Sequence, residues 1–314
     1  MPSPIRIGLQ IPNFNFPGVA PEQLYDKLTD IAQTAERSGF ESIWVMDHLN
    51  QIPGVGPMEN WMLEGNVALM ALAARTQKLH VGLMVGGVTY RNPAFFAKQT
   101  TTIDVLSGGR AIFGIGAAWF EAEHEAFGYR FPPIAERFEH LEDALRIARA
   151  MFTEDQPTVQ GTHSNVKAIY NNPRPIRSDI PIMVGGSGER KTLRMVAQYA
   201  DASNMFGDVE RIRHLVGVLQ GHCDVLGRDI GEITKTKLAS LIIGDDAATR
   251  AQPLRETMGE RFDGVVIHGS ADEVAKHIQA HLDAGLDGIV VNMPYVHDLE
   301  QVELAGQTLA RVIG

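Results

Sequence analysis

Acid–base chemistry in this sequence is best placed at the pair Asp47-His48, which directly follows the short apolar run Ser42–Met46. An imidazole titrates near neutral pH, so His48 could accept or donate the proton that accompanies a redox or elimination step. Asp47 could stabilise the charged imidazole or hold a cofactor. Both side chains could instead only cap the loop through hydrogen bonds, and their position in the sequence leaves the two interpretations open.

A second candidate is an anion-binding loop at Gly185–Thr192, where Gly-Gly-Ser-Gly follows an apolar run and precedes a helical pattern. Small residues let a phosphate approach the backbone, and the free N–H groups and dipole of a helix N-terminus stabilise its charge. The loop is not a Walker motif, because no Gly-Lys-Ser/Thr follows at the required spacing. We predict phosphate binding here, with an ordinary glycine-rich turn as the alternative.

Three other patterns do not predict a functional site. Gly114–Gly116 begins like a dinucleotide-binding fingerprint, but Trp119 occupies the place of the third glycine, so a Rossmann site is not supported. Glu121–Glu125 contains three glutamates and a histidine on one polar segment, which predicts a solvated helix face and no metal site. Cys223 lies in a predicted helix without a paired base, so we predict a structural role for it.

The elements that must position these residues alternate along almost the whole chain, with short β-branched runs followed by helical patterns. This alternation is typical of parallel βα units, and eight such runs are the number that closes an α/β (β/α)8 TIM barrel. The predicted strands are Ile5–Ile11, Ser42–Met46, Leu79–Val85, Ala111–Ile115, Ile182–Gly185, Ala202–Met205, Thr236–Ile243 and Gly288–Asn292.

In such a barrel, ligands contact the C-terminal ends of the strands and the loops that follow. This rule places Asp47-His48 and the glycine-rich loop on the same face. We predict a single domain over residues 1–314, with insertions at this face at about 117–136, 153–181 and 245–263. The second insertion contains a predicted hairpin around Gln160–Thr162.

Composition excludes several classes of protein. The 314 residues are 44% hydrophobic and 21% charged, which excludes a disordered chain. A net charge of −10 argues against nucleic acid or an anionic membrane as a partner. One cysteine excludes an internal disulfide framework, and no apolar run is long enough for a membrane span. The N-terminal residues lack a signal-peptide pattern, so we expect a cytoplasmic protein.

Five motifs, taken in order and spacing, identify a family that the chain resembles between Ile5 and Pro294. The motifs are Ser42–His48, Gly86–Pro93, Asp104–Arg110, Gly114–His124 and Val184–Gly188. Together they resemble the luciferase-like monooxygenase superfamily, a group of (β/α)8 barrels that use FMN or the deazaflavin coenzyme F420. Within that group the resemblance is closest to the F420-dependent oxidoreductases.

The resemblance implies roles for matching residues. Asp47 and His48 match the pair that contacts the deazaflavin and supplies the acid or base. Gly87-Val88 matches a strand-three bulge with a non-prolyl cis peptide behind the ring. The resemblance also implies that Gly186, Ser187 and Gly188 would hold the phosphate. The full set of predicted cofactor-binding residues is Asp47, Gly86, Gly87, Val88, Thr89, Gly116, Ala117, Gly185, Gly186, Ser187 and Gly188.

One residue departs from the pattern of the sugar-phosphate dehydrogenases of this group, which carry a second catalytic acid, a glutamate, at the position matched here by Trp119. A neutral aromatic side chain cannot donate such a proton, which argues against glucose-6-phosphate oxidation. Trp119, Trp61 and Phe14 together predict a pocket for a more apolar substrate, with simple packing as the alternative for Trp61.

The leading hypothesis is therefore an F420-dependent oxidoreductase that transfers a hydride to or from a small organic molecule, with His48 as acid or base. An FMN-dependent monooxygenase with a separate reductase is the alternative enzyme, and a non-catalytic flavin- or deazaflavin-binding protein is the alternative of another class. The resemblance also implies a homodimer. We predict no metal in the site, and neither nucleic acid nor a membrane as a partner.

Overall fold

Eight parallel strands form a closed ring in which each strand pairs with its two neighbours and the last pairs with the first. The structure is a computed structural model, and it describes residues 5–314. The ring order is β1 (Ile7–Ile11), β2 (Ser42–Val45), β3 (His80–Leu83), β5 (Ala111–Gly116), β8 (Ile182–Gly185), β9 (Ala202–Met205), β10 (Thr234–Ile243) and β12 (Gly288–Asn292). Ile7 lies opposite Ile289, which closes the ring. The eight predicted strands and the (β/α)8 fold are confirmed.

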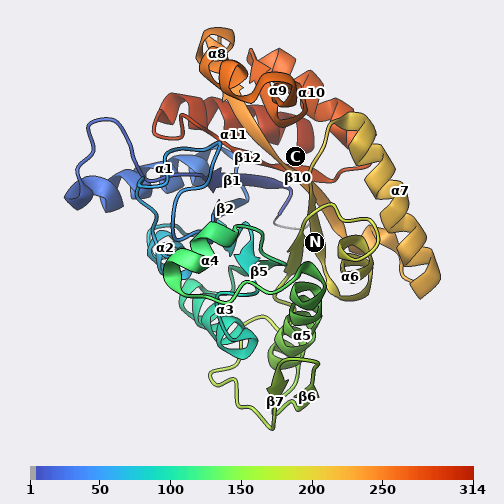
Figure 1. Ribbon diagram of the computed structural model, residues 1–314. Coiled ribbons are helices and arrows are strands. Elements are labelled where there is room, and N and C mark those ends of the chain that lie inside the picture. The colour runs from blue at the N-terminus through green and yellow to red at the C-terminus, as the bar shows by residue number, and fades with distance from the viewer. Residues whose placement is uncertain (1–4) are drawn as a thin grey trace.

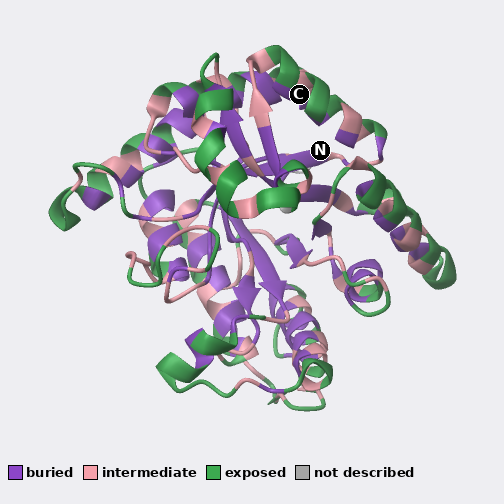
Figure 2. Cartoon of the chain, turned by 45° about the horizontal axis from the view of Figure 1, so that its top comes forward, coloured by how far each residue is buried: buried purple, intermediate pink, exposed green. Residues whose placement is uncertain are grey.

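Helices form the outer layer around this ring, as Figure 1 shows in a view into the barrel. The helices are α1 (Leu24–Ser38), α2 (Gly65–Ala73), α3 (Pro93–Ser107), α4 (Glu121–Phe127), α5 (Ile134–Thr153), α6 (Thr192–Tyr199), α7 (Val209–Leu226), α8 (Ala247–Met258), α9 (Phe262–Val265), α10 (Ala271–Asp283) and α11 (Leu299–Ile313). Buried residues gather on the strands and on the inner faces of the helices (Figure 2). In α1, the buried residues Leu24, Leu28, Ile31 and Ala35 are three or four positions apart, so they form one face that packs against the core.

A smaller cluster of buried side chains fills the inside of the barrel around Trp44. Trp44 is completely buried, and its indole Nε1 donates a hydrogen bond to the Ser42 hydroxyl at 2.9 Å. Gly8 and Gly82 stand beside the indole, and a Cβ at either position would come within 2.7 Å of it. Glycines in the neighbouring strands thus make room for the tryptophan that fills the barrel interior.

Two short strands lie outside the predicted set. β4 (Gly86–Gly87) pairs with β5 after β3 has ended. β11 (Val266–Gly269) pairs with residues Ser240–Ile243 of β10, which continue beyond the part of β10 that pairs with β12. The long β10 therefore has a free edge at its C-terminal end, and β11 covers it.

The three segments predicted as insertions carry structure of their own. Residues 117–136 include α4, and residues 245–263 include α8. Residues 153–181 include an antiparallel hairpin of β6 (Val159–Gln160) and β7 (Asn165–Val166), which confirms the predicted hairpin and lies beyond α5 in Figure 1. Within residues 5–314, the structure contains no helix long and apolar enough to cross a membrane.

Candidate active site

A cavity of about 460 Å³ opens where the C-terminal ends of the barrel strands converge. Residues at the strand ends line this cavity. Among them are Gln10 from β1, Asn204 from β9 and Asn292 from β12. The predicted site residues that line the cavity are Asp47, His48, Gly86, Gly87, Gly116, Ala117, Trp119, Gly185 and Gly186. The structure therefore brings the Asp-His pair and the start of the glycine-rich loop to one cavity.

Other predicted residues lie elsewhere. Phe14 is buried in the core between barrel and helices, and Trp61 packs half-buried against that core, so neither lines the cavity. The prediction that these two aromatic residues form a substrate pocket is therefore not supported by their positions. Val88 and Thr89 instead line a separate hollow of about 260 Å³.

The strand-three bulge lies at a different position from the predicted one. The non-prolyl cis peptide joins Met84 and Val85, and not Gly87 and Val88. The irregular backbone falls there because β3 ends at Leu83 and pairing with β5 resumes only at Gly86. Val85 consequently lines the cavity.

Asp47 is held by a bidentate ion pair with Arg91. The Arg91 guanidinium donates two hydrogen bonds, of 2.6 and 2.8 Å, to the two carboxylate oxygens, and the Gly87 N–H donates a third at 2.8 Å. Burial acts to lower the pKa of Arg91, but the hydrogen bonds and charge of Asp47 outweigh it and raise this pKa. Burial raises the pKa of Asp47, because the hydrogen bonds and charge of Arg91 offset it only in part. The short bidentate contact is the geometry of an ionised carboxylate with a guanidinium. Asp47 thus ties the end of β2 to the bulge after β3.

His48 is oriented by a buried glutamate that the sequence analysis did not select. Nδ1 of His48 lies 3.0 Å from Oε2 of Glu123, a side chain with no exposed surface. Burial acts to raise the pKa of Glu123, but hydrogen bonds from His48, Tyr90 and the Asn50 N–H lower it overall. The ionised carboxylate can only accept, so Nδ1 carries a proton and Nε2 remains as the nitrogen that can exchange one.

The same carboxylate has further donors that fix its place. It accepts hydrogen bonds from the backbone N–H groups of Leu49 and Asn50 and from the Tyr90 hydroxyl. Burial, followed by the neighbouring Glu123, strongly raises the pKa of Tyr90, so the phenol stays protonated and donates. Glu123 therefore connects α4, the loop after β2 and the loop after β4.

The prediction of a solvated helix face at Glu121–Glu125 is wrong for two of its residues. Glu123 and His124 are fully buried, whereas Glu121 and Glu125 are exposed. His124 receives a hydrogen bond from Thr89 on Nε2 at 2.6 Å, because its Nδ1 donates to the Phe120 carbonyl at 2.8 Å. Phe120, Glu123 and His124 have the spacing of one helical face, which is the signal that could have identified an inward side of α4.

The glycine-rich loop begins in the cavity wall, which Gly185 and Gly186 line. Gly186 has a φ of +127°, in the region that favours glycine, and its N–H donates to the Asn204 carbonyl at 2.9 Å. The Ser187 hydroxyl accepts a hydrogen bond of 2.8 Å from the Phe206 N–H. Ser187 and Gly188 do not line the cavity but lead from it to the start of α6.

One buried polar atom in the cavity wall has no partner among the described residues. The Oδ1 atom of Asn204 makes no hydrogen bond, while its Nδ2 donates to the Thr236 hydroxyl at 3.0 Å. A buried carbonyl oxygen without a donor is unfavourable.

Comparisons with known proteins agree with this geometry. A family model described as luciferase-like monooxygenase matches residues 5–260. The chain is 29% identical to an F420-dependent glucose-6-phosphate dehydrogenase of Kineococcus radiotolerans, covering 85% of this chain and 87% of that protein. It is 24% identical to an FMNH(2)-dependent dimethylsulfone monooxygenase of Pseudomonas putida, covering 87% and 75%.

Solved structures share the fold at lower identity. The coenzyme F420-dependent tetrahydromethanopterin reductase of Methanopyrus kandleri superposes with a TM-score of 0.82 at 18% identity, covering 98% of this chain and 99% of that one. An F420-dependent secondary alcohol dehydrogenase, solved with an F420-acetone adduct, gives a TM-score of 0.79 at 16% identity, covering 98% of both chains.

Proposed function

The chain belongs to the luciferase-like monooxygenase family, and on this premise we propose that it is an F420-dependent oxidoreductase that uses His48 as its acid or base. The observation that carries the proposal is a cavity-lining imidazole whose Nδ1 is held by the buried Glu123. Nε2 of His48 would take up or release the proton that accompanies hydride transfer.

The residues of the cavity fit a phosphorylated deazaflavin. Bound F420 supplies hydride transfer at its ring, while the protein supplies position and electrostatics. The loop from Gly185 to Gly188, which leads from the cavity to the start of α6, would hold its phosphate. A Cβ at Gly188 would come within 2.8 Å of the Thr192 hydroxyl, so the entry into α6 favours glycine at this position.

We propose a neutral and rather apolar substrate. Of the residues between 5 and 314 that line the cavity, none is a lysine or arginine, and the carboxylate of Asp47 is already paired with Arg91. A phosphorylated sugar would therefore meet no free cation there. Trp119 is 58% exposed at the cavity and makes an edge contact with the His48 ring, with centroids 5.6 Å apart.

Binding of the two candidate cofactors tests the first part of the proposal. We expect the purified protein to bind F420 in the micromolar range, followed by absorbance or fluorescence, and to bind FMN more weakly. Binding of FMN alone would overturn the assignment of F420. It would favour an FMN-dependent monooxygenase, the activity of the similar Pseudomonas putida protein, and oxygen consumption with reduced FMN would then identify that reaction.

Turnover tests the role of His48. With F420 and a panel of neutral alcohols and ketones, we expect His48→Ala to retain cofactor binding and to lose about 10²- to 10⁴-fold in kcat. Glucose-6-phosphate is expected to give no turnover. Unchanged kcat in the variant would remove His48 from the mechanism, and F420 binding without turnover on any substrate would favour a non-catalytic binding protein.

A further inference from the structure

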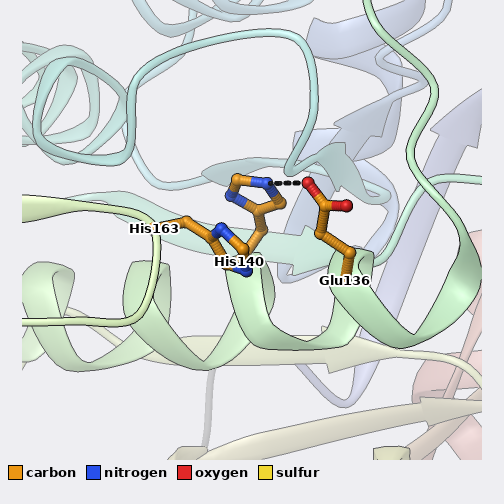
Figure 3. Close-up of side chains that lie close together, drawn as sticks. All are labelled: Glu136, His140 and His163. Atoms are coloured by element: carbon orange, nitrogen blue, oxygen red, sulfur yellow. Dashed lines mark ion pairs between the residues drawn. The ribbon is translucent and has the colours of Figure 1, made fainter.

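Three side chains of types that can ligate a metal converge on the outside of the barrel, away from the cavity. Glu136 and His140 lie one turn apart on α5, and His163 reaches them from the loop of the β6–β7 hairpin (Figure 3). Each residue offers a ligand atom within 4.8 Å of the other two. Their side chains are only 22 to 27% exposed, so they are partly ordered by packing.

The hairpin loop is built so that His163 faces α5. The carboxylate of Asp143, which also lies on α5, accepts hydrogen bonds from the backbone N–H groups of Thr162, His163 and Ser164 at 2.9, 2.7 and 2.9 Å. The His140 and His163 rings then lie next to each other, with centroids 4.3 Å apart. The position of His163 is thus fixed independently of its own side-chain contacts.

We propose that Glu136, His140 and His163 bind a divalent transition metal of the Zn²⁺ type. Two imidazoles and one carboxylate suit Zn²⁺ and Co²⁺, whereas Mg²⁺ and Ca²⁺ prefer oxygen ligands. His140 Nε2 and Glu136 Oε1 are 3.6 Å apart, close to the separation of about 3.4 Å that tetrahedral bonds of about 2.1 Å require. Water or another carboxylate would complete the coordination.

A fourth residue, Glu139 on α5, contacts His163. Nε2 of His163 lies 2.8 Å from Oε2 of Glu139. Metal-bound histidines commonly contact a carboxylate that orients the ring, and Glu139 is placed either for that role or as a further ligand.

Arg130 competes for the same carboxylate. Its guanidinium contacts both oxygens of Glu136, one of them at 3.0 Å. The Arg130 side chain is 71% exposed, so it can turn into solvent, and exposed ion pairs contribute little stability. A metal would replace Arg130 at this carboxylate.

Zn²⁺ titration of tag-free, EDTA-treated protein by calorimetry tests the proposal. We expect one site per chain, with affinity at least tenfold weaker in His140→Ala and in His163→Ala. Removing the competitor in Arg130→Ala should strengthen binding. His214→Ala is the matched control, because this exposed imidazole also lies near a carboxylate, Glu189 at 3.2 Å, and its removal should leave affinity unchanged.

Two further measurements keep the test decisive. Glu136→Gln preserves side-chain shape and should also weaken Zn²⁺ binding, which guards against a histidine variant that fails to fold. Zn²⁺, but not Mg²⁺, should raise the melting temperature of the wild type, because the ion joins the hairpin to α5 only in the folded chain. The proposal is wrong if the wild type binds no Zn²⁺ stoichiometrically, or if the histidine variants bind it as tightly as the wild type does.

Discussion

At the scale of single residues, the buried carboxylate of Glu123 determines which nitrogen of His48 can exchange a proton. Glu123 has no exposed surface, and it accepts hydrogen bonds from His48, Tyr90 and two backbone N–H groups. A buried charge with this many donors holds its partners in one arrangement. We therefore regard Glu123 as a positioning residue for His48.

Glu123→Gln is predicted to lower kcat by about tenfold to a hundredfold with a smaller effect on cofactor affinity. A neutral amide can donate as well as accept, so it no longer fixes the proton on Nδ1 of His48 and leaves Nε2 less well defined as the nitrogen that exchanges a proton. Glu125→Gln, an exposed glutamate on the same helix, is the matched control and should behave like the wild type. A kcat equal to that of the wild type, or a loss of cofactor affinity as large as the loss of kcat, would contradict the positioning role.

The same residue links stability to pH. The pKa of Glu123 is lowered in the folded state, so its contribution is present above the unfolded pKa and is lost as pH falls through the folded value. We expect the wild type to exceed Glu123→Gln in free energy of unfolding at pH 7, with the difference shrinking below about pH 4. Urea unfolding at pH 7 and pH 3.5 measures this change, and a difference that grows in acid would contradict it.

Lys237 gives a second increase of stability with pH, in the alkaline range. It is almost fully buried outside the barrel, where Nζ donates to the Gly207 carbonyl at 2.6 Å and lies 3.2 Å from His281 Nε2. Burial lowers the pKa of Lys237 to about 8, and the nearby Asp208 only partly offsets this. The same burial, followed by the charge of Lys237, lowers the pKa of His281, so the imidazole stays neutral beside the lysine.

Lys237 should therefore make the protein more stable as pH rises. Between pH 8 and 10 the unfolded chain still binds the lysine proton while the folded chain releases it. Relative to Lys237→Met, the wild type should gain about 2 kcal/mol of unfolding free energy over this interval. Urea unfolding at pH 7.5 and 10 tests the sign, and a relative loss of wild-type stability at pH 10 would refute the interpretation.

At the scale of elements, glycines in the strands next to β2 leave room for the Trp44 side chain inside the barrel. Gly82→Ala would place a Cβ 2.6 Å from the indole of Trp44, and we expect a cost of about 1–3 kcal/mol. Gly217→Ala on α7 meets nothing within 4 Å and should stabilise the helix by up to about 1 kcal/mol. Chemical denaturation measures the free energy of unfolding of both variants. Equal values for Gly82→Ala and Gly217→Ala would show that the barrel interior can adjust to the added methyl group.

The strands could be predicted from the sequence because buried parallel strands form short continuous apolar runs between helices. The inner face of α4 was missed, because polar residue types predict exposure even where their spacing marks one helical face, and because the partners of Glu123 are distant in sequence. Tyr90 is 33 residues away and His48 is 75. Asp47, His48 and the glycine-rich loop were identified because they directly follow predicted strands, which the barrel brings to one face.

At the scale of the whole molecule, two adjoining helices carry exposed apolar side chains. Gly65–Ala73 of α2 contains no charged residue, and most of the helix is buried. Val67 on its outer face is 69% exposed, and Phe95 on the adjoining α3 is 57% exposed. Asn66 Nδ2 donates to Gln99 Oε1 at 3.3 Å and ties the two helices together. These exposed apolar side chains on adjoining helices are the observation that favours a partner at this surface.

We propose that the partner is a second copy of the chain, as the family resemblance also implies. Light scattering coupled to size-exclusion chromatography should give the mass of a dimer for the wild type. Val67→Glu combined with Phe95→Glu should weaken association at least tenfold, because each subunit of a two-fold dimer would bury the same charges against its partner. Val225→Glu on α7, where the side chain is 85% exposed, should leave the dimer intact. A monomeric wild type, or a double variant that dimerises normally, would show that the apolar outer face of α2 does not mediate self-association.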